Sequence, residues 1–238
     1  MQQEEIPDDF GIYEQKPNVL RKRNTVTAFG VIGMLCIVLA YGCIQKSNKG
    51  VDNGNGRIGY RNGKVLYQSC MLCHSLQEMQ RGPILDGMQS WYVLEQLEKF
   101  KKGIRGKNPN NRAEHLMGAS MERLENLDEI KTVSNYVQNL PKRKHLTTIK
   151  GDQKNGRLLY QKCAVCHGLD AKGIRIKKSP SLRTQEDWFL LDQLRKYKAG
   201  LRGSHPDDIY GRIMGESVRN WKDSDLKDVV VYLNNLVD

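Results

Sequence analysis

Two pairs of cysteines, each followed at once by a histidine, are the residues of this 238-residue chain best suited to do chemistry. One run holds Cys70, Cys73 and His74, and the other holds Cys163, Cys166 and His167. Two thiols three positions apart can bond to the two vinyl groups of one haem, and the histidine that follows can ligate its iron. We therefore expect two covalently bound haem c groups.

Paired cysteines also occur in redox dithiols and in zinc sites. A dithiol does not need the histidine that follows each pair here. A zinc site would have to account for two identical half-sites in separate parts of the chain. Both alternatives are weaker than haem attachment.

The second ligand of each iron is expected among the methionines that follow the cysteine runs. Met117 and Met214 occupy matching positions of an internal repeat, whereas the other methionines of the first half have no methionine counterpart. We expect these two to be axial ligands. His115 is the rival in the first half, weakened because its counterpart is Arg212.

A methionine sulfur raises the reduction potential of a haem relative to histidine or thiolate. With histidine and methionine both bound, the iron has no open position for a substrate. This ligand set favours electron transfer over catalysis on a small molecule.

Two prolines, Pro83 and Pro180, follow the cysteine runs at matching positions. We expect each to lie at a loop in which a backbone carbonyl accepts the other ring N–H of the ligand histidine. Such a bond fixes the orientation of the imidazole.

The internal repeat begins near residue 58. Residues 62–70 match residues 155–163 at an offset of 93, and from Pro83 onward the offset is 97. Residues 133–140 match residues 229–236, near the end of the chain, at an offset of 96. The repeat predicts two duplicate lobes, lobe one at residues 58–140 and lobe two at residues 152–238, joined by a linker at residues 141–151.

Apolar residues of each lobe recur at the spacing of an amphipathic helix, and no useful strand alternation is present. We predict an all-α fold with helices before, between and after the ligand-bearing loops. The periodic residues are Val93, Leu97, Phe100, Ile104, Ile130, Val133, Val137 and Leu140, with counterparts Leu190, Leu194, Tyr197, Leu201, Leu226, Val229, Val230 and Leu233.

Residues 25–44 carry no charge and are long enough to cross a hydrocarbon core of about 30 Å as a helix. Arg21, Lys22 and Arg23 stand directly before this segment, and only Lys46 and Lys49 follow it closely. The positive-inside rule then predicts a single-pass inner-membrane anchor, with the leader at residues 1–24 in the cytoplasm and the lobes in the periplasm. Residues 45–57 form the tether.

A cleaved signal peptide and a lipoprotein signal ending at Cys43 are the alternatives to an anchor. A signal peptide normally begins with a short basic region, whereas about twenty residues with several acidic side chains come first here. The uncleaved anchor is therefore favoured.

The chain has 38 basic and 27 acidic residues, and residues 1–44 hold only four and five of these, so the remainder has 34 − 22 = +12. This excess predicts redox partners with acidic docking faces. Nucleic acid is disfavoured, because no basic helix is interleaved with base-stacking aromatics. One charge run is typical of a solvated helix end, with a docking surface for a redox partner as the alternative. It comprises Lys99, Lys101, Lys102, Arg105 and Lys107.

With these features together, residues 58–238, about three quarters of the chain, resemble a tandem class I cytochrome c of the dihaem type. The resemblance rests on Tyr-x-x-Cys-x-x-Cys-His in both lobes and on Gln-Leu-x-x-Phe/Tyr-Lys-x-Gly-x-Arg at residues 96–105 and 193–202. It also rests on the later methionine and on a terminal helix with Tyr136 or Tyr232. Ser75 departs from the glycine that usually follows the motif.

The resemblance implies an electron carrier between respiratory complexes and not an enzyme with a small-molecule substrate. One alternative is an integral dihaem subunit of a terminal oxidase or quinol-oxidising complex. A dihaem peroxidase is a rival of another class, and it would need one iron that is open or can open.

Overall fold

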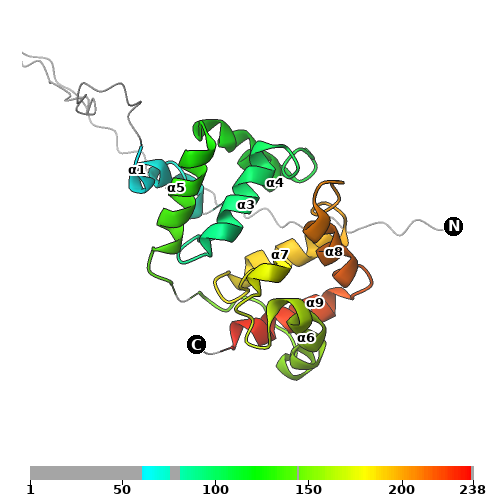
Figure 1. Ribbon diagram of the computed structural model, residues 1–238. Coiled ribbons are helices and arrows are strands. Elements are labelled where there is room, and N and C mark those ends of the chain that lie inside the picture. Colours follow the sequence, from blue (N-terminus) through cyan, green and yellow to red (C-terminus); the bar gives the residue numbers. More distant parts are fainter. Residues whose placement is uncertain (1–60, 76–80, 144, 237–238) are drawn as a thin grey trace, which may run out of the picture. The chain divides into compact units, whose positions relative to one another are not determined.

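The computed structural model describes residues 61–75, 81–143 and 145–236. Within these ranges the regular structure is helical, apart from one isolated antiparallel bridge between Ile174 and Ser179 (Figure 1). The predicted all-α class is confirmed for this part of the chain. The predicted leader, anchor and tether lie outside the described residues, and no described helix is long and apolar enough to cross a membrane.

Lobe one contains five α-helices and a short 3-10 helix within the described residues. Helix α5 packs against α1 and α3, and α4 packs against α3. Side chains of Asn62 and Asn126 accept hydrogen bonds from the first turns of α1 and α5, as helix caps do. The elements are α1 (Gly63–Gln68), α2 (Met71–His74), α3 (Ser90–Lys101), α4 (Arg112–Ser120), η1 (Met121–Arg123) and α5 (Leu127–Gln138).

Lobe two repeats this arrangement with α6 in place of α1 and α2. Helix α6 packs against α9, and α7 packs against α8 and α9. Asp152 and Asp208 cap α6 and α8 through their carboxylates. The elements are α6 (Gln153–His167), η2 (Arg175–Lys177), α7 (Asp187–Lys198), α8 (Ile209–Val218) and α9 (Asp223–Asn234).

Three predicted helices end earlier than their apolar periodicity suggested. Ile104 and Leu201 lie beyond the ends of α3 and α7, because Gly103 and Gly200 adopt left-handed φ angles of 70° and 69°. Such a glycine commonly terminates a helix. Leu140 lies beyond α5, and the proline that follows it disfavours helical backbone there.

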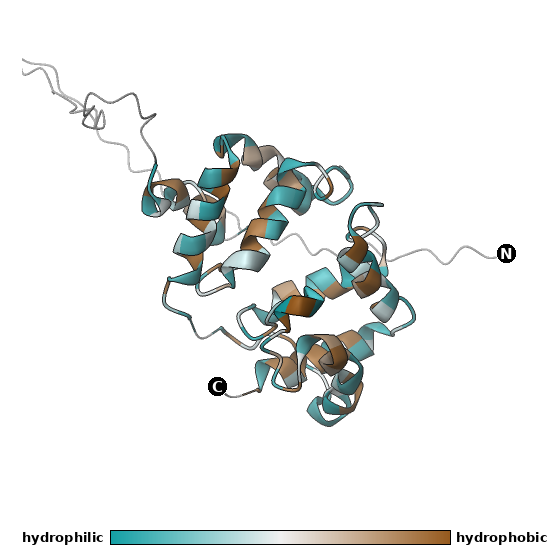
Figure 2. Cartoon of the chain, in the orientation of Figure 1, coloured by the Kyte–Doolittle hydropathy of each residue, from teal (hydrophilic) through white to brown (hydrophobic). Residues whose placement is uncertain are grey.

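Each lobe has its own hydrophobic core, and hydrophobic residues alternate with hydrophilic ones along the helices (Figure 2). Equivalent aromatic pairs lie in the two cores. The ring centroids of Tyr67 and Tyr136 are 5.5 Å apart, and those of Tyr160 and Tyr232 are 5.3 Å apart. The repeated tyrosines therefore serve packing, as an aromatic pair in a core does.

Glycines allow the first and last helices of each lobe to approach closely. A Cβ atom at Gly63 would lie 2.6 Å from Cβ of Tyr136, and one at Gly156 would lie 1.9 Å from the backbone oxygen of Asp228. The repeated Asn-Gly pair thus marks a helix crossing that places the cysteine run against the terminal helix.

Candidate functional site

The predicted haem-attachment residues of lobe two lie at the C-terminal end of α6. Cys163 and Cys166 are free thiols, and both are half-buried. Burial raises the pKa of Cys163 to about 11, so this thiol is protonated at neutral pH. The helix ends after His167, where Gly168 has a left-handed φ of 81°.

The ring of His167 is oriented by a backbone carbonyl. Its Nδ1 lies 2.9 Å from the oxygen of Pro180. A carbonyl oxygen can only accept, so Nδ1 carries the proton and Nε2 keeps a lone pair for a metal. Burial lowers the pKa of His167, which favours this neutral form.

Lobe one has the same contact. Nδ1 of His74 lies 2.7 Å from the oxygen of Pro83, and burial lowers the pKa of His74 as well. A Cβ atom at Gly82 would lie 2.5 Å from Cε1 of His74, so the backbone packs directly on the ring. The predicted hydrogen bond from each histidine to a backbone carbonyl of its proline loop is confirmed.

A cavity of about 460 Å³, within the range of cofactor-binding pockets, opens in lobe two and is closed on one side by residues of α3 in lobe one. Its lining includes Cys163, Cys166 and His167 from the end of α6 and Met214 from α8. The structure therefore brings all four predicted residues of this lobe to one cavity, although Met214 is 47 positions from His167 in the sequence.

In lobe one, Met117 is half-buried and packs against the hydrophobic core. Ser120 Oγ donates to the Met117 carbonyl at 2.7 Å and lies 3.6 Å from its sulfur. His115, the rival ligand, is exposed, and its Nδ1 lies 3.1 Å from the oxygen of Gly106. Cys70 is half-buried and Cys73 is exposed.

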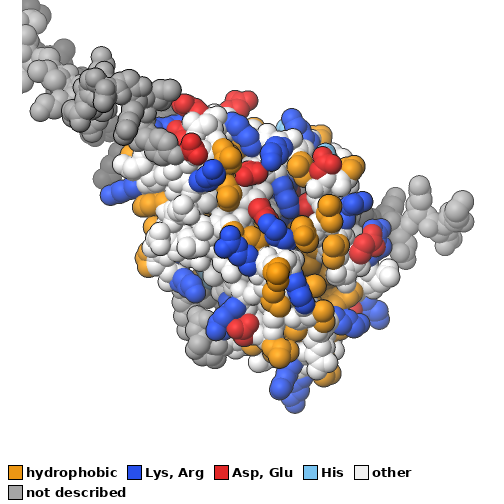
Figure 3. Space-filling model, viewed as in Figure 1, with side chains coloured by type: hydrophobic (Ala, Val, Ile, Leu, Met, Phe, Trp, Pro, Cys, Tyr) orange, Lys and Arg blue, Asp and Glu red, His pale blue; other side chains and the backbone are white. Residues whose placement is uncertain are grey.

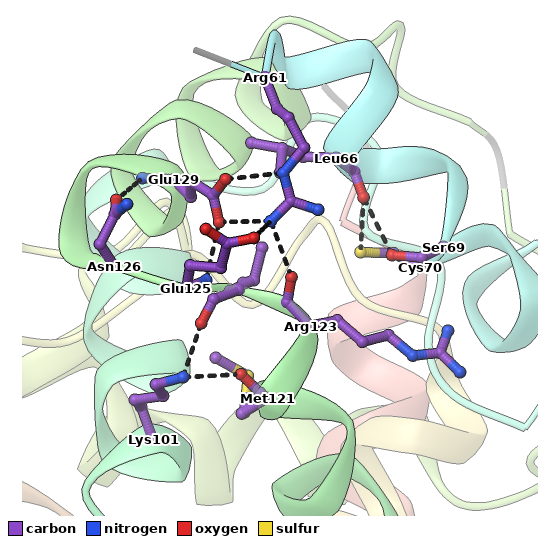
Figure 4. A network of polar contacts seen from close by, with 11 residues as sticks. Arg61, Leu66, Ser69, Cys70, Lys101, Met121, Arg123, Glu125, Asn126 and Glu129 are labelled. Atoms are coloured by element: carbon purple, nitrogen blue, oxygen red, sulfur yellow. Dashed lines mark hydrogen bonds and ion pairs between the residues drawn. The ribbon is translucent and has the colours of Figure 1, made fainter. Parts of the chain in front are cut away.

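A polar network fixes the helix that precedes Cys70 against the rest of lobe one (Figure 4). Arg61 donates to both carboxylate oxygens of Glu129 at 2.7 Å, which ties the start of α1 to α5. Lys101 donates to the backbone oxygens of Met121 and Leu124 at 3.1 and 2.6 Å. Lys101 therefore closes a turn of the chain, although the residue is exposed as the predicted solvated helix end requires.

Arginine and glutamine side chains from both lobes form a second network, which sequence reasoning did not find. We call the four residues Gln96, Arg105, Gln193 and Arg202 the interlobe network. Arg105 donates to the side-chain oxygens of Gln96 and Gln193, each at 2.9 Å. Arg202 donates to the same two oxygens at 3.1 and 2.6 Å. The one sequence signal was that both residue types recur at the same offset.

The two arginines of the interlobe network have further polar partners. Arg105 donates to Glu114 at 2.6 Å, and Arg202 donates to the hydroxyl of Tyr92 at 3.0 Å. Lys99, also in the predicted solvated run, pairs with Asp208 of lobe two at 2.8 Å. Lys99 and Arg105 therefore join the lobes, whereas Lys101, Lys102 and Lys107 are exposed, as predicted for a solvated helix end.

These features fit haem c in lobe two, and lobe one has the matching thiols and oriented imidazole. The lobe-two cavity has a suitable volume, and the free thiols and oriented imidazoles are the groups that attachment requires. Nε of Arg105 is buried and has no hydrogen-bond acceptor among the described residues. An acidic haem side chain could supply one. Within the described ranges, no group of three or more His, Cys, Asp or Glu side chains could hold a metal ion.

The fold and the site together define a protein with two helical lobes, each built to hold one covalently attached haem. The cytochrome c family matches residues 60–141 and 153–237, and the chain belongs to this family. A search of curated proteins found no matching relative.

Solved structures with the same fold include two cytochromes c4. That of Acidithiobacillus ferrooxidans has a TM-score of 0.56 and 21% identity, and the match covers 71% of this chain and 99% of the other. That of Pseudomonas stutzeri has a TM-score of 0.57 and 18% identity, with 74% and 97% covered. The thiosulfate dehydrogenase of Marichromatium purpuratum has a TM-score of 0.57 and 24% identity; the match covers 73% of this chain and 39% of that longer one.

Proposed function

We propose that the chain is a membrane-anchored dihaem cytochrome c that transfers electrons between respiratory complexes in the periplasm. The observation that carries this proposal is the lobe-two cavity, which unites Cys163, Cys166, His167 and Met214. Membership of the cytochrome c family supports it. When bound, haem supplies a one-electron redox centre, and the protein holds it in place.

The two sides of each site have separate tasks in this proposal. His74 and His167 present Nε2 because Pro83 and Pro180 hold Nδ1. Met117 and Met214 would supply the second protein ligand of each iron, and a thioether would raise the reduction potential. With two protein ligands, the iron would have no place for a substrate, which supports a carrier over a peroxidase.

Membrane attachment and orientation are proposed from the sequence. Residues 25–44 would span the inner membrane, and the basic residues 21–23 would keep the leader in the cytoplasm. Covalent haem attachment in bacteria takes place outside the cytoplasm, as the family resemblance implies. Both considerations place the lobes in the periplasm.

The proposed partners have acidic docking faces. Lysine and arginine side chains are spread over the visible face with hydrophobic side chains between them (Figure 3). In lobe two, Ile176 is 90% exposed and Val165 is 65% exposed, and Lys177 donates to the Val165 carbonyl at 2.6 Å. An apolar contact surrounded by cations suits a surface with carboxylates at its rim.

A second candidate is a subunit of an oxidoreductase complex. The specific observation is the match to the thiosulfate dehydrogenase, of which this chain covers 39%. The remaining part of that longer chain lies outside the match. An integral dihaem subunit of a terminal oxidase or quinol-oxidising complex is a variant of the same proposal.

Purification from membranes in mild detergent tests these alternatives. A carrier is expected to elute alone, to be reduced by a quinol-oxidising complex and to be reoxidised by a terminal oxidase. Co-isolation with other subunits at a fixed ratio would favour the complex. Rapid reaction with peroxide and a substantial high-spin signal in the oxidised spectrum would contradict both.

A further inference from the structure

The loop that orients each histidine is held by a side chain from the other lobe. In lobe one, the amide nitrogen of Ile84 donates to Oε2 of Glu186 at 2.8 Å. In lobe two, the amide nitrogen of Ser181 donates to Oε1 of Gln89 at 2.8 Å. Ile84 and Ser181 are equivalent at the offset of 97, and so are Gln89 and Glu186. The same contact thus ends in a carboxylate at lobe one and in a neutral amide at lobe two.

One peptide group connects Glu186 to the ligand histidine of lobe one. Its N–H is that of Ile84, and its carbonyl is that of Pro83, which accepts from Nδ1 of His74 at 2.7 Å. Hydrogen bonds in such a chain polarise one another. A carboxylate at one end makes the carbonyl a stronger acceptor, and a stronger acceptor makes the imidazole a better electron donor to iron.

The interlobe network has a second asymmetry with the same sign. Arg105 of lobe one is paired with the buried carboxylate of Glu114. The counterpart of Glu114 in lobe two is Gly211, so Arg202 has no equivalent carboxylate. Arg202 also lines the lobe-two cavity. Among its described residues, lobe two thus has no carboxylate of its own in contact with its buried arginine, whereas Glu114 contacts Arg105 directly and acts on Arg202 through its charge alone.

We propose that Glu186 is a redox-positioning residue that holds the reduction potential of lobe one below that of lobe two. Ferric haem carries one more positive charge than ferrous haem, so a nearby carboxylate favours the oxidised state and a nearby cation favours the reduced state. With haem bound in both lobes, an electron that entered lobe one would pass to lobe two, so that the first iron would be oxidised and the second reduced. No proton or other reactant is needed. The inference rests on the proposed dihaem function.

Redox titration of the detergent-solubilised full-length holoprotein, followed by absorbance, tests the inference. The wild type should show two one-electron waves. Glu186→Gln keeps an acceptor for the Ile84 amide and should raise the midpoint potential of the lower-potential wave only. We expect the equilibrium constant for electron transfer between lobes to fall about tenfold, equivalent to about 59 mV. Gln89→Glu should lower only the higher wave.

The double variant Gln89→Glu/Glu186→Gln exchanges the two side chains. It should reduce the difference between the two midpoint potentials more than either single variant does. Met214→His assigns the waves, because loss of the thioether should lower the lobe-two wave. Asp128→Asn is the matched control, since it removes an equal charge from an exposed position of lobe one and should move neither wave.

Three results would overturn the inference: an unchanged lower wave in Glu186→Gln, an equal shift of both waves, or a lobe-two wave that is the lower one. If Glu186→Gln does not fold, an unchanged higher wave in Gln89→Glu overturns it in the same way. A wild-type protein without two haem waves would instead refute the proposed function, so the two failures are distinguishable.

Discussion

The backbone oxygen of Asp228 occupies the space that a side chain at Gly156 would need. A Cβ atom there would lie 1.9 Å from that oxygen, and both helices would have to shift. Because α6 carries the cysteines of lobe two and α9 is its largest packing partner, this contact positions the site. The crossing therefore fixes the position of the helix that carries Cys163 and Cys166.

Gly156→Ala should destabilise lobe two by about 3 kcal/mol, because overpacking at a helix crossing forces backbone movement. Gly215→Ala is the control. Its Cβ would meet only the Tyr197 oxygen at 3.4 Å, an ordinary contact, so stability should be unchanged or slightly higher. Denaturant unfolding of the holoprotein measures both, and equal stability of the two variants would contradict the role of the crossing.

Asp187 should make the stability of lobe two depend on pH. It is fully buried and accepts hydrogen bonds from the backbone amides of Thr148 and Ile149, which attach the linker to α7. Burial would raise the pKa of Asp187, but these bonds outweigh it and lower the pKa. In the unfolded protein the pKa of an aspartate is about 3.9, and above that pH the ionised Asp187 contributes its full stabilisation. This stabilisation is lost as the pH falls through the lower pKa that Asp187 has in the folded protein.

Asp187→Asn should therefore cost about 2 kcal/mol at neutral pH, since hydrogen bonds to a charged group are among the stronger ones. The difference from wild type should shrink as the pH falls below about 4. Thermal unfolding across this pH range measures it. A difference that stays constant with pH would show that charge at Asp187 contributes nothing.

Arg202→Gln should weaken the contact between the lobes. It removes three hydrogen bonds of a buried guanidinium, those to Gln193, Gln96 and Tyr92, and leaves Arg105 as the remaining donor to the two glutamine oxygens; the loss should cost about 2 kcal/mol. We expect lower stability and faster cleavage of the 141–151 linker by a protease. The exposed Lys131→Gln serves as control, and equal cleavage rates of the two variants would contradict the importance of the interlobe network.

The axial methionines are tested one at a time. Met117→Ala and Met214→Ala should each remove part of the charge-transfer band between methionine sulfur and ferric iron, and both together should remove all of it. Each substitution should also lower the potential of its own haem. Absorbance spectra in both redox states give the answer, and a band that survives both changes would exclude these ligands.

Much of the site could be predicted because its determinants are local in sequence. The Cys-x-x-Cys-His runs lie on single helices or their ends, and the proline loops lie nine and thirteen residues after the histidines. Helix ends were harder, since Gly103 and Gly200 end α3 and α7 although the apolar periodicity continues.

The contacts between lobes could not be predicted, because they join residues far apart in sequence. Glu186 and Ile84 are 102 positions apart, and Arg202 and Tyr92 are 110 apart. Lys99 looked like a solvated surface lysine, and only the packed lobes place it beside Asp208. Polar residues that recur at a repeat offset are the signal that would have suggested this interface.

Haem content per chain tests the central claim most directly. Intact mass and quantitative haem absorbance of the denatured protein should give two covalently bound haems for the wild type. Cys163→Ala/Cys166→Ala and Cys70→Ala/Cys73→Ala should each keep one. A wild-type chain with the mass of its bare sequence would contradict the account. So would a wild-type chain with a single haem that is still present in each of the two double variants.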